Sequence, residues 1–230
     1  MKKNRIRLIA VGMLLLCCSV SLSGCKKVTS QVKSITSGVK QTLKGKESVE
    51  EEQELKKFNK VSVDLMSADV NIEWGDGYSI EITRTADYPI EAEVSKKTLL
   101  IHSDNSAPKN NLSATLNITV PKKASLTSVD VDVAAGDFSV RDISVDKISL
   151  KPAAGDCTIE GCQIQELDVD GNVSDVLVKD SVSIKDTSLS LATDVGTIKV
   201  GGKERKSPYK KKDGKNFIKV DVSVGDITIK

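Results

Sequence analysis

A repeat of about 20 residues constrains this 230-residue chain more than any other feature. The segment SVDVDVAAGDFSVRDISVD, which begins at Ser128, is followed at once by KISLKPAAGDCTIEGCQIQ, so that Gly136-Asp137 is answered by Gly155-Asp156. Related steps recur later in the chain at Ser174-Asp175, Gly196-Thr197 and Gly225-Asp226. Self-similarity at this period, with strand-like alternation, predicts a stack of coils rather than a closed globule.

Apolar and polar residues alternate within each repeat, as in Val129 and Val131 before Gly136 and in Phe138 and Val140 after it. Period-two alternation places the apolar side chains on one face of a strand. We therefore expect an all-β, single-domain β-solenoid whose coils stack in chain order. Equivalent residues of successive coils should lie directly over one another: Val131, Leu150, Val169 and Leu191. The apolar residue before each corner should also point inward: Ala135, Ala154, Val173, Val195 and Val224.

The Gly-Asp step is the expected corner between two half-coils. Glycine tolerates positive φ, and an aspartate side chain can accept hydrogen bonds from backbone amides just beyond it. Stacked carboxylates also suggest an alternative, a row of calcium ligands at Asp137, Asp156 and Asp175. The chain lacks the denser G-G-x-G-x-D pattern of calcium-binding repeats, which favours corner capping and no metal site.

Residues 1–24 have the pattern of a secretory signal peptide. Four basic residues precede an apolar run, residues 8–20, that is too short to span a bilayer comfortably. The run leads to Leu22-Ser23-Gly24-Cys25, which resembles a bacterial lipobox. That resemblance implies cleavage after Gly24 and a diacylglycerol on the Cys25 thiol, which would anchor the protein to the membrane. The alternative is an ordinary signal peptide with a chance cysteine.

Residues 25–58 are interpreted as a tether, because lysines without acids fill 26–46 and glutamates fill 47–54. Val28, Val32, Ile35 and Val39 recur at helical spacing, so a weak amphipathic helix on anionic headgroups is an alternative to a solvated linker. Loss of residues 1–24 removes four basic residues and no acid, which takes the formal net charge from +2 to −2. That balance argues against a nucleic-acid partner.

The folded part is expected over residues 59–230, and its opening section reads as a series of hairpins. Alternating strands are separated by turns at Lys96-Lys97 and across Asp104–Asn111, and Pro121 leads into the repeats.

A basic insertion at residues 201–216 lengthens the step before the last repeat. We interpret it as a loop, either solvated and mobile or binding an anionic envelope polymer. Its basic residues are Lys203, Arg205, Lys206, Lys210, Lys211, Lys212 and Lys215.

Candidate catalytic chemistry is sparse in this sequence. The single histidine, His102, lacks the supporting residues of a triad or of a three-ligand zinc site. Cys157 and Cys162 fall in the apolar register, as small buried residues or, in an exported protein, as a disulfide. Outward acids such as Asp130 and Asp168 would serve a polysaccharide-processing site only with a basic partner. We expect no catalytic residues and no cofactor, and therefore no enzyme.

The stretch from about Val61 to Lys230 resembles a bacterial putative-adhesin family of unknown function. The resemblance rests on Ile118-Thr119-Val120-Pro121-Lys122, on the AAGDFSV repeat and on the terminal VGDITI. It implies an envelope β-solenoid with a structural, adhesive or envelope-stress role. With the lipobox, the expected protein is a lipoprotein on the extracytoplasmic side of the cell membrane, where its neighbour would be an envelope protein or an anionic polymer. A carbohydrate-binding or polysaccharide-processing solenoid is the alternative.

Overall fold

The computed structural model describes residues 41–43, 46–103 and 111–230, and its side chains from Ser48 onward. The predicted signal peptide, the predicted lipobox with Cys25 and residues 26–40 lie outside the described residues. No helix in the described part is long and apolar enough to cross a bilayer.

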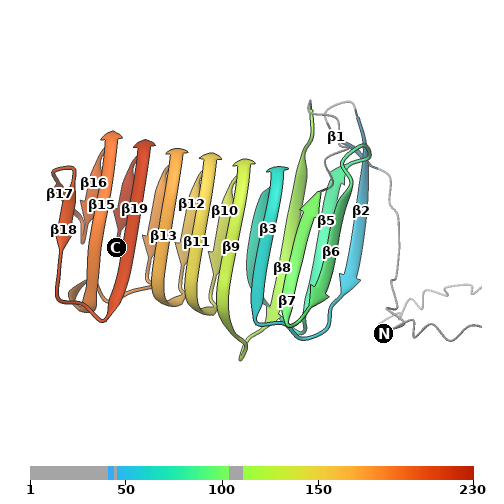
Figure 1. Ribbon diagram of the computed structural model, residues 1–230, viewed down its shortest axis with the longest axis horizontal. Coiled ribbons are helices and arrows are strands. Elements are labelled where there is room, and N and C mark those ends of the chain that lie inside the picture. Colours follow the sequence, from blue (N-terminus) through green and yellow to red (C-terminus); the bar gives the residue numbers. More distant parts are fainter. Residues whose placement is uncertain (1–40, 44–45, 104–110) are drawn as a thin grey trace, which may run out of the picture. The chain divides into compact units, whose positions relative to one another are not determined.

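Two β-sheets make up the described fold (Figure 1). Sheet A runs in the order β1 (Gln41–Leu43), β2 (Lys46–Glu54), β5 (Ser79–Thr85), β8 (Ala114–Pro121), β4 (Asp69–Gly75), β10 (Phe138–Arg141), β12 (Cys157–Glu160), β14 (Val176–Lys179), β20 (Ile227–Ile229), β16 (Ile198–Val200) and β17 (Lys203–Arg205). Sheet B runs in the order β18 (Tyr209–Lys211), β15 (Thr187–Val195), β19 (Asn216–Val224), β13 (Gln163–Val173), β11 (Ser144–Ala154), β9 (Ser125–Ala135), β3 (Lys60–Ser67), β7 (Thr98–Ser103) and β6 (Ile90–Ser95). A short 3₁₀ helix, η1 (Ile184–Asp186), precedes β15.

The repeat forms coils with one strand in each sheet, which confirms the predicted β-solenoid. Among the described strands, the coils β3–β4, β9–β10, β11–β12 and β13–β14 follow one another with parallel pairing. Val131, Leu150 and Val169 are direct register partners. All three face a shared apolar interior and are almost completely buried.

The last two coils do not stack in chain order, so this part of the prediction is wrong. β19 lies between β13 and β15, and β20 lies between β14 and β16. Val220 therefore separates Val169 from Leu191 in the core. The chain first builds the outer coil β15–β16, and its final residues then return to occupy the intervening rung. Strands in both rungs carry the same apolar alternation, so either order buries the same side chains.

The apolar position before each corner is exposed, contrary to expectation. Val133 is 4% exposed, whereas Ala135 on the same strand is exposed because the chain has begun to turn out of the sheet. The larger residues at this position are 54% exposed at Val173, 42% at Val224 and 64% at Val195. Alternation identifies the inward face of a strand but does not show at which residue the inward-pointing side chains end.

The corner glycines adopt the backbone that the sequence predicts, with φ of +139° at Gly136 and +141° at Gly155. The corner aspartates act differently from the prediction, because each carboxylate accepts a hydrogen bond from the corner amide of the neighbouring coil. Asp156 N donates to Asp137 Oδ1 at 2.8 Å, and Asp226 N donates to Asp175 Oδ1 at 2.7 Å. This ladder runs from Asp69 to Thr197, so the corner aspartates join the coils to one another.

Ser174 stands at the corner position where the other repeats have glycine, and its side chain stabilises this corner. The Ser174 hydroxyl donates to Gly155 O at 2.6 Å and lies 3.6 Å from Cys157 Sγ, and the residue is 2% exposed. A serine at this corner therefore lacks the conformational freedom of glycine but makes a buried hydrogen bond to the adjacent coil.

The fold begins earlier than predicted, because the tether assignment is wrong for its last part. β2 pairs antiparallel with β5 across seven residue pairs, and Phe58 is 1% exposed in the core. The Glu-rich strand has little apolar alternation of its own, and the edge strand β1 pairs only with its first three residues, so that most of its carboxylates remain partly solvated.

One of the two predicted hairpins is present. β6 and β7 pair antiparallel around Lys96 and Lys97, whose φ values of +48° and +67° suit a two-residue turn. The second hairpin prediction is wrong, because β7 belongs to sheet B and β8 to sheet A. The connection over residues 104–110 lies outside the described residues.

Candidate functional site

The basic insertion is an ordered cap at one end of the stack and not the loop that we expected. The hairpin at Gly201-Gly202 reverses the chain, so that β17 pairs antiparallel with β16, and β18 then pairs antiparallel with β15 (Figure 1). The segment 203–211, here called the basic cap, thus extends both sheets by one short, reversed strand. The Gly-Gly pair was the available sequence signal for this hairpin.

Hydrogen bonds fasten the basic cap to the last coil. Lys211 Nζ donates to the carbonyl oxygens of Lys185 and Thr187, at 2.9 Å each. Thr193 N donates to Ser207 Oγ at 3.0 Å, and the Ser207 hydroxyl donates to Thr193 O at 2.8 Å. One predicted anion-binding residue, Lys211, is therefore engaged in holding the cap in place.

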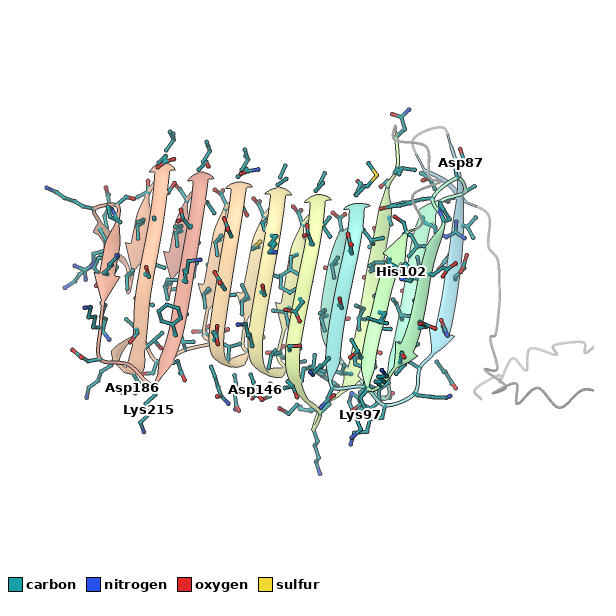
Figure 2. All side chains as sticks on the ribbon, viewed as in Figure 1. Asp87, Lys97, His102, Asp146, Asp186 and Lys215 are labelled. Atoms are coloured by element: carbon teal, nitrogen blue, oxygen red, sulfur yellow. The ribbon has the colours of Figure 1, made fainter. Side chains whose placement is uncertain are left out.

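Arg205 is also partly engaged, since its guanidinium lies 5.3 Å from the centre of the Tyr209 ring. The remaining five basic residues of the predicted set are exposed on and beside the cap: Lys203, Lys206, Lys210, Lys212 and Lys215. Figure 2 shows Lys215 at the end of the stack opposite Lys97 and His102.

Three lysines on the faces of the sheets are paired across rungs, whereas no ion pair of this kind involves those five lysines within the described residues. Lys147 Nζ lies 2.8 Å from Glu166 Oε1, and Lys219 Nζ lies 3.0 Å from Asp168 Oδ1. Lys179 pairs with Glu160, and this hydrogen bond lowers the pKa of the Glu160 carboxyl. Cross-rung pairing therefore neutralises part of the charge on the sheet faces.

An acidic hollow lies on the outer face of sheet B. It contains acids and a basic residue, the combination that a polysaccharide-processing site would require. Asp64, Asp130 and Asp132 line a shallow depression of about 240 Å³ together with Lys151. These four side chains are all exposed on an open face. Asp168, another acid in the predicted group, pairs with Lys219 instead. Exposed carboxylates of this kind keep a sheet face soluble, and the depression that they line is open to solvent.

The corner carboxylates fit the capping interpretation better than the calcium alternative, because one oxygen of each aspartate in the corner ladder accepts a hydrogen bond from a backbone amide. In the described part of the chain, no group of three or more His, Cys, Asp or Glu residues is placed to hold a metal ion. His102 lies on a sheet face with Nε2 3.8 Å from Glu91 Oε2, at the end of the stack remote from the cap.

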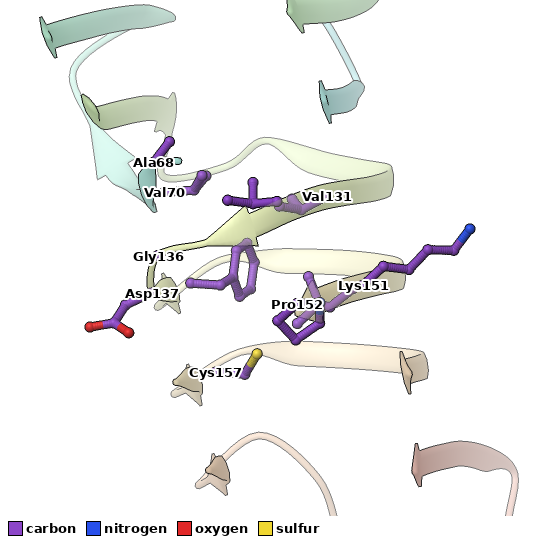
Figure 3. A pocket seen from close by; sticks show the side chains of 11 residues that line it. Ala68, Val70, Val131, Gly136, Asp137, Lys151, Pro152 and Cys157 are labelled. Atoms are coloured by element: carbon purple, nitrogen blue, oxygen red, sulfur yellow. The ribbon is translucent and has the colours of Figure 1, made fainter. Parts of the chain in front are cut away.

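Cys157 and Cys162 are buried free thiols, so the structure favours the small-core-residue interpretation over a disulfide. Cys157 lines a cavity of only about 10 Å³, whose other lining groups include Val131 and Pro152 (Figure 3). The figure shows the Asp137 carboxylate and the Lys151 amine pointing away from this space. The cavity is therefore a small packing gap in the core, with no room for a ligand.

Burial raises the pKa of the Cys157 thiol from 9.0 to about 11. The unfolded chain would release this proton near pH 9, so the thiol stabilises the fold below pH 9 and loses that contribution as pH rises to about 11. We expect the stability advantage of the wild type over Cys157→Ala to shrink by about 2–3 kcal/mol between pH 8 and pH 11. Denaturant unfolding at each pH measures this advantage, and a constant difference would contradict the prediction.

A ridge of exposed apolar residues follows the corner edge, and sequence reasoning missed it by assigning these residues to the core. Val173, Val224 and Val195 are adjacent in register, with Ala135 and Ala154 continuing the row. The sequence signal for their exposure was their position directly before the turn, where strand alternation no longer determines which way a side chain points.

Parallel two-strand coils, corner residues in register and a capped last rung define a β-solenoid. The family described as Toastrack DUF4097 matches residues 58–206, and the chain belongs to this family. The match ends before β18, β19 and β20, although β19 and β20 occupy an interior rung of the stack.

A solved structure shares this fold at low sequence identity. A protein from Clostridium sporogenes titled "putative cell adhesion protein" has 16% identity and a TM-score of 0.55, with 78% of this chain and 97% of that one covered. A Bacteroides fragilis protein titled "putative adhesin" has 14% identity and a TM-score of 0.39, over 80% of this chain and 97% of that one. No curated protein matches the chain.

Proposed function

We propose that this protein is a lipid-anchored, non-catalytic interaction module of the cell envelope, held to the membrane through Cys25. The lipobox supports the anchor, and the adhesin-related titles of structurally similar proteins are compatible with an envelope role. Charges paired across rungs and carboxylates engaged in the corner ladder support a scaffold rather than an enzyme.

The observation that carries this proposal is the polarity of the stack. The first described strands, β1 and β2, lie at one end of sheet A, with β6 at the same end of sheet B, while the basic cap closes the opposite end (Figure 1). Eight strand spacings in sheet B separate β6 from β18, which corresponds to about 40 Å at ~4.8 Å per strand. An anchored protein of this form would present its sheet faces and its cap to partners away from the attachment point.

Replacing Cys25 by alanine should move the protein from the membrane fraction to the soluble extracytoplasmic fraction, because a thioether-linked lipid needs the thiol. The measurement is fractionation of intact cells with immunoblotting, together with mass spectrometry of the mature N-terminus. Cys18→Ala is the matched control and should leave the protein in the membrane fraction. Membrane retention of Cys25→Ala, or a mature N-terminus other than Cys25, would contradict the anchor.

A polymer-binding role is favoured by the basic cap over the alternative of polysaccharide processing. The acidic hollow on sheet B is open and exposed, whereas the cap carries concentrated positive charge on a fixed surface.

A further inference from the structure

We propose that the basic cap binds a phosphodiester polymer of the cell envelope at the end of the stack remote from β1 and β2. The inference deepens the proposed interaction function and rests on it for the extracytoplasmic location. It does not depend on the lipid itself, because the cap belongs to the folded part of the chain.

The first reason is uncompensated charge. Residues 201–216 contain seven basic and two acidic residues, an excess of five positive charges. On the sheet faces, by contrast, Lys147 is paired with Glu166, Lys179 with Glu160 and Lys219 with Asp168. On the cap, Lys203, Lys206 and Lys210 are exposed to solvent on two short strands and the link between them. Such a concentration of one charge draws an anion with several negative groups.

The second reason is that the charges sit on an ordered surface. β17 is fixed by β16, β18 is fixed by β15, and Ser207 is bonded twice to Thr193 between the two strands. Binding therefore orders lysine side chains but not the backbone beneath them, which lowers the entropic cost of association.

The kind of anion follows from the side chains available. Lysine ammonium groups act as point charges suited to single phosphates, whereas Arg205, the one guanidinium of the cap, lies over Tyr209. The five exposed lysines are spread along the end of both sheets. A small phosphate would meet one or two of them, while a flexible chain of phosphodiesters can meet most of them in turn.

The lysines have a second physical role that the experiment must separate from binding. β17 and β18 are the open edges of their sheets, and edge lysines discourage edge-to-edge pairing between molecules. An edge-protecting role predicts self-association when the lysines are neutralised, and it predicts no affinity of the wild type for a polymer.

The test is binding of poly(glycerol phosphate) to the detergent-solubilised full chain, measured by calorimetry at low and high salt. A cap variant changes five lysines to glutamine: Lys203, Lys206, Lys210, Lys212 and Lys215. A control variant removes the same charge from exposed lysines elsewhere: Lys56, Lys57, Lys60, Lys97 and Lys123. Poly-glutamate of similar length tests whether phosphate chemistry matters.

We expect the wild type and the control variant to bind poly(glycerol phosphate), the cap variant to lose at least about tenfold in affinity, and binding to weaken steeply with salt as counterions are released. Absence of wild-type binding at low salt, equal loss in both variants, or equal affinity for poly-glutamate would overturn the proposal. Self-association of the cap variant without wild-type binding would assign the lysines to edge protection alone. The Cys25→Ala protein should still bind, so failure of the anchor and failure of the cap proposal give different results.

Discussion

Replacing Gly155 by alanine should lower the free energy of unfolding by about 3–5 kcal/mol, an effect at the upper end for single substitutions. Gly155 has φ of +141°, a backbone that residues with a side chain rarely adopt. A Cβ atom there would lie 2.0 Å from Gly136 O, which is backbone and cannot move without shifting the neighbouring corner. The substitution therefore strains two coils and displaces the Asp137–Asp156 rung of the ladder.

Gly77→Ala is the matched control for this prediction. A Cβ at Gly77 meets no atom within 4 Å, so its effect should stay within about 0.5 kcal/mol. Denaturant unfolding followed by circular dichroism compares the two variants. A Gly155→Ala protein as stable as Gly77→Ala would show that the corner does not need glycine and would contradict the corner geometry described here.

Replacing Val220 by aspartate should destabilise the fold by about 4 kcal/mol or more, enough to unfold a marginal stack. Val220 is fully buried between Val169 and Leu191, and an aspartate there would have no partner in the apolar interior. Because the residue lies on an interior rung, its loss disrupts the coils on both sides. If β19 were the terminal rung, as chain order suggests, only the end of the stack would loosen.

Val224→Asp places the same charge on the same strand, at a position that is 42% exposed. Its cost should stay below about 1 kcal/mol, because the carboxylate remains solvated. Hydrogen exchange of β13 and β15 amides locates the damage, with loss of protection expected on both strands in Val220→Asp. Protection lost on β15 alone, or equal effects of the two substitutions, would contradict the described packing.

The solenoid itself could be predicted from sequence, because its cause is local and repeated. Alternation at Val129 and Val131, a corner at Gly136 and a return of the same pattern at Gly155 indicate one coil, and stacking is the way for such coils to bury their apolar faces. The corner conformation also follows from residue type, since glycine is the residue that adopts positive φ at low cost.

The order of the last coils could not be predicted, since β13 could pair equally well with β15 or with β19. Val220 and Leu191 present the same apolar face to Val169, so the hydrophobic pattern does not distinguish the arrangements. The insertion at 201–216 carried the relevant information. It is long enough to run back across the end of the stack as β17 and β18 before the chain continues into β19 and β20, which form the rung between β13–β14 and β15–β16.

The basic residues of the candidate site could be identified from the sequence, but their arrangement in the fold could not. The basic residues were evident from composition, whereas the engagement of Lys211 with two carbonyl oxygens depends on the fold. β2 was missed for a related reason, because this Glu-rich strand is stabilised by pairing with β5 and shows little alternation. The exposed Val195 illustrates the converse error, in which an apolar residue in the right register points to solvent.

Cysteine pairs on the outer face of sheet B test the order of the coils most directly. Asp170 and Asp221 are register partners, so the double variant Asp170→Cys/Asp221→Cys should form a disulfide on mild oxidation, identified by peptide mass mapping. Ala192 pairs with Asp221 and therefore lies two rungs, or about 10 Å, from Asp170, beyond the reach of a disulfide. The account predicts a disulfide between the two introduced cysteines in the first variant and none in Asp170→Cys/Ala192→Cys. A disulfide in the second variant and not in the first would contradict it.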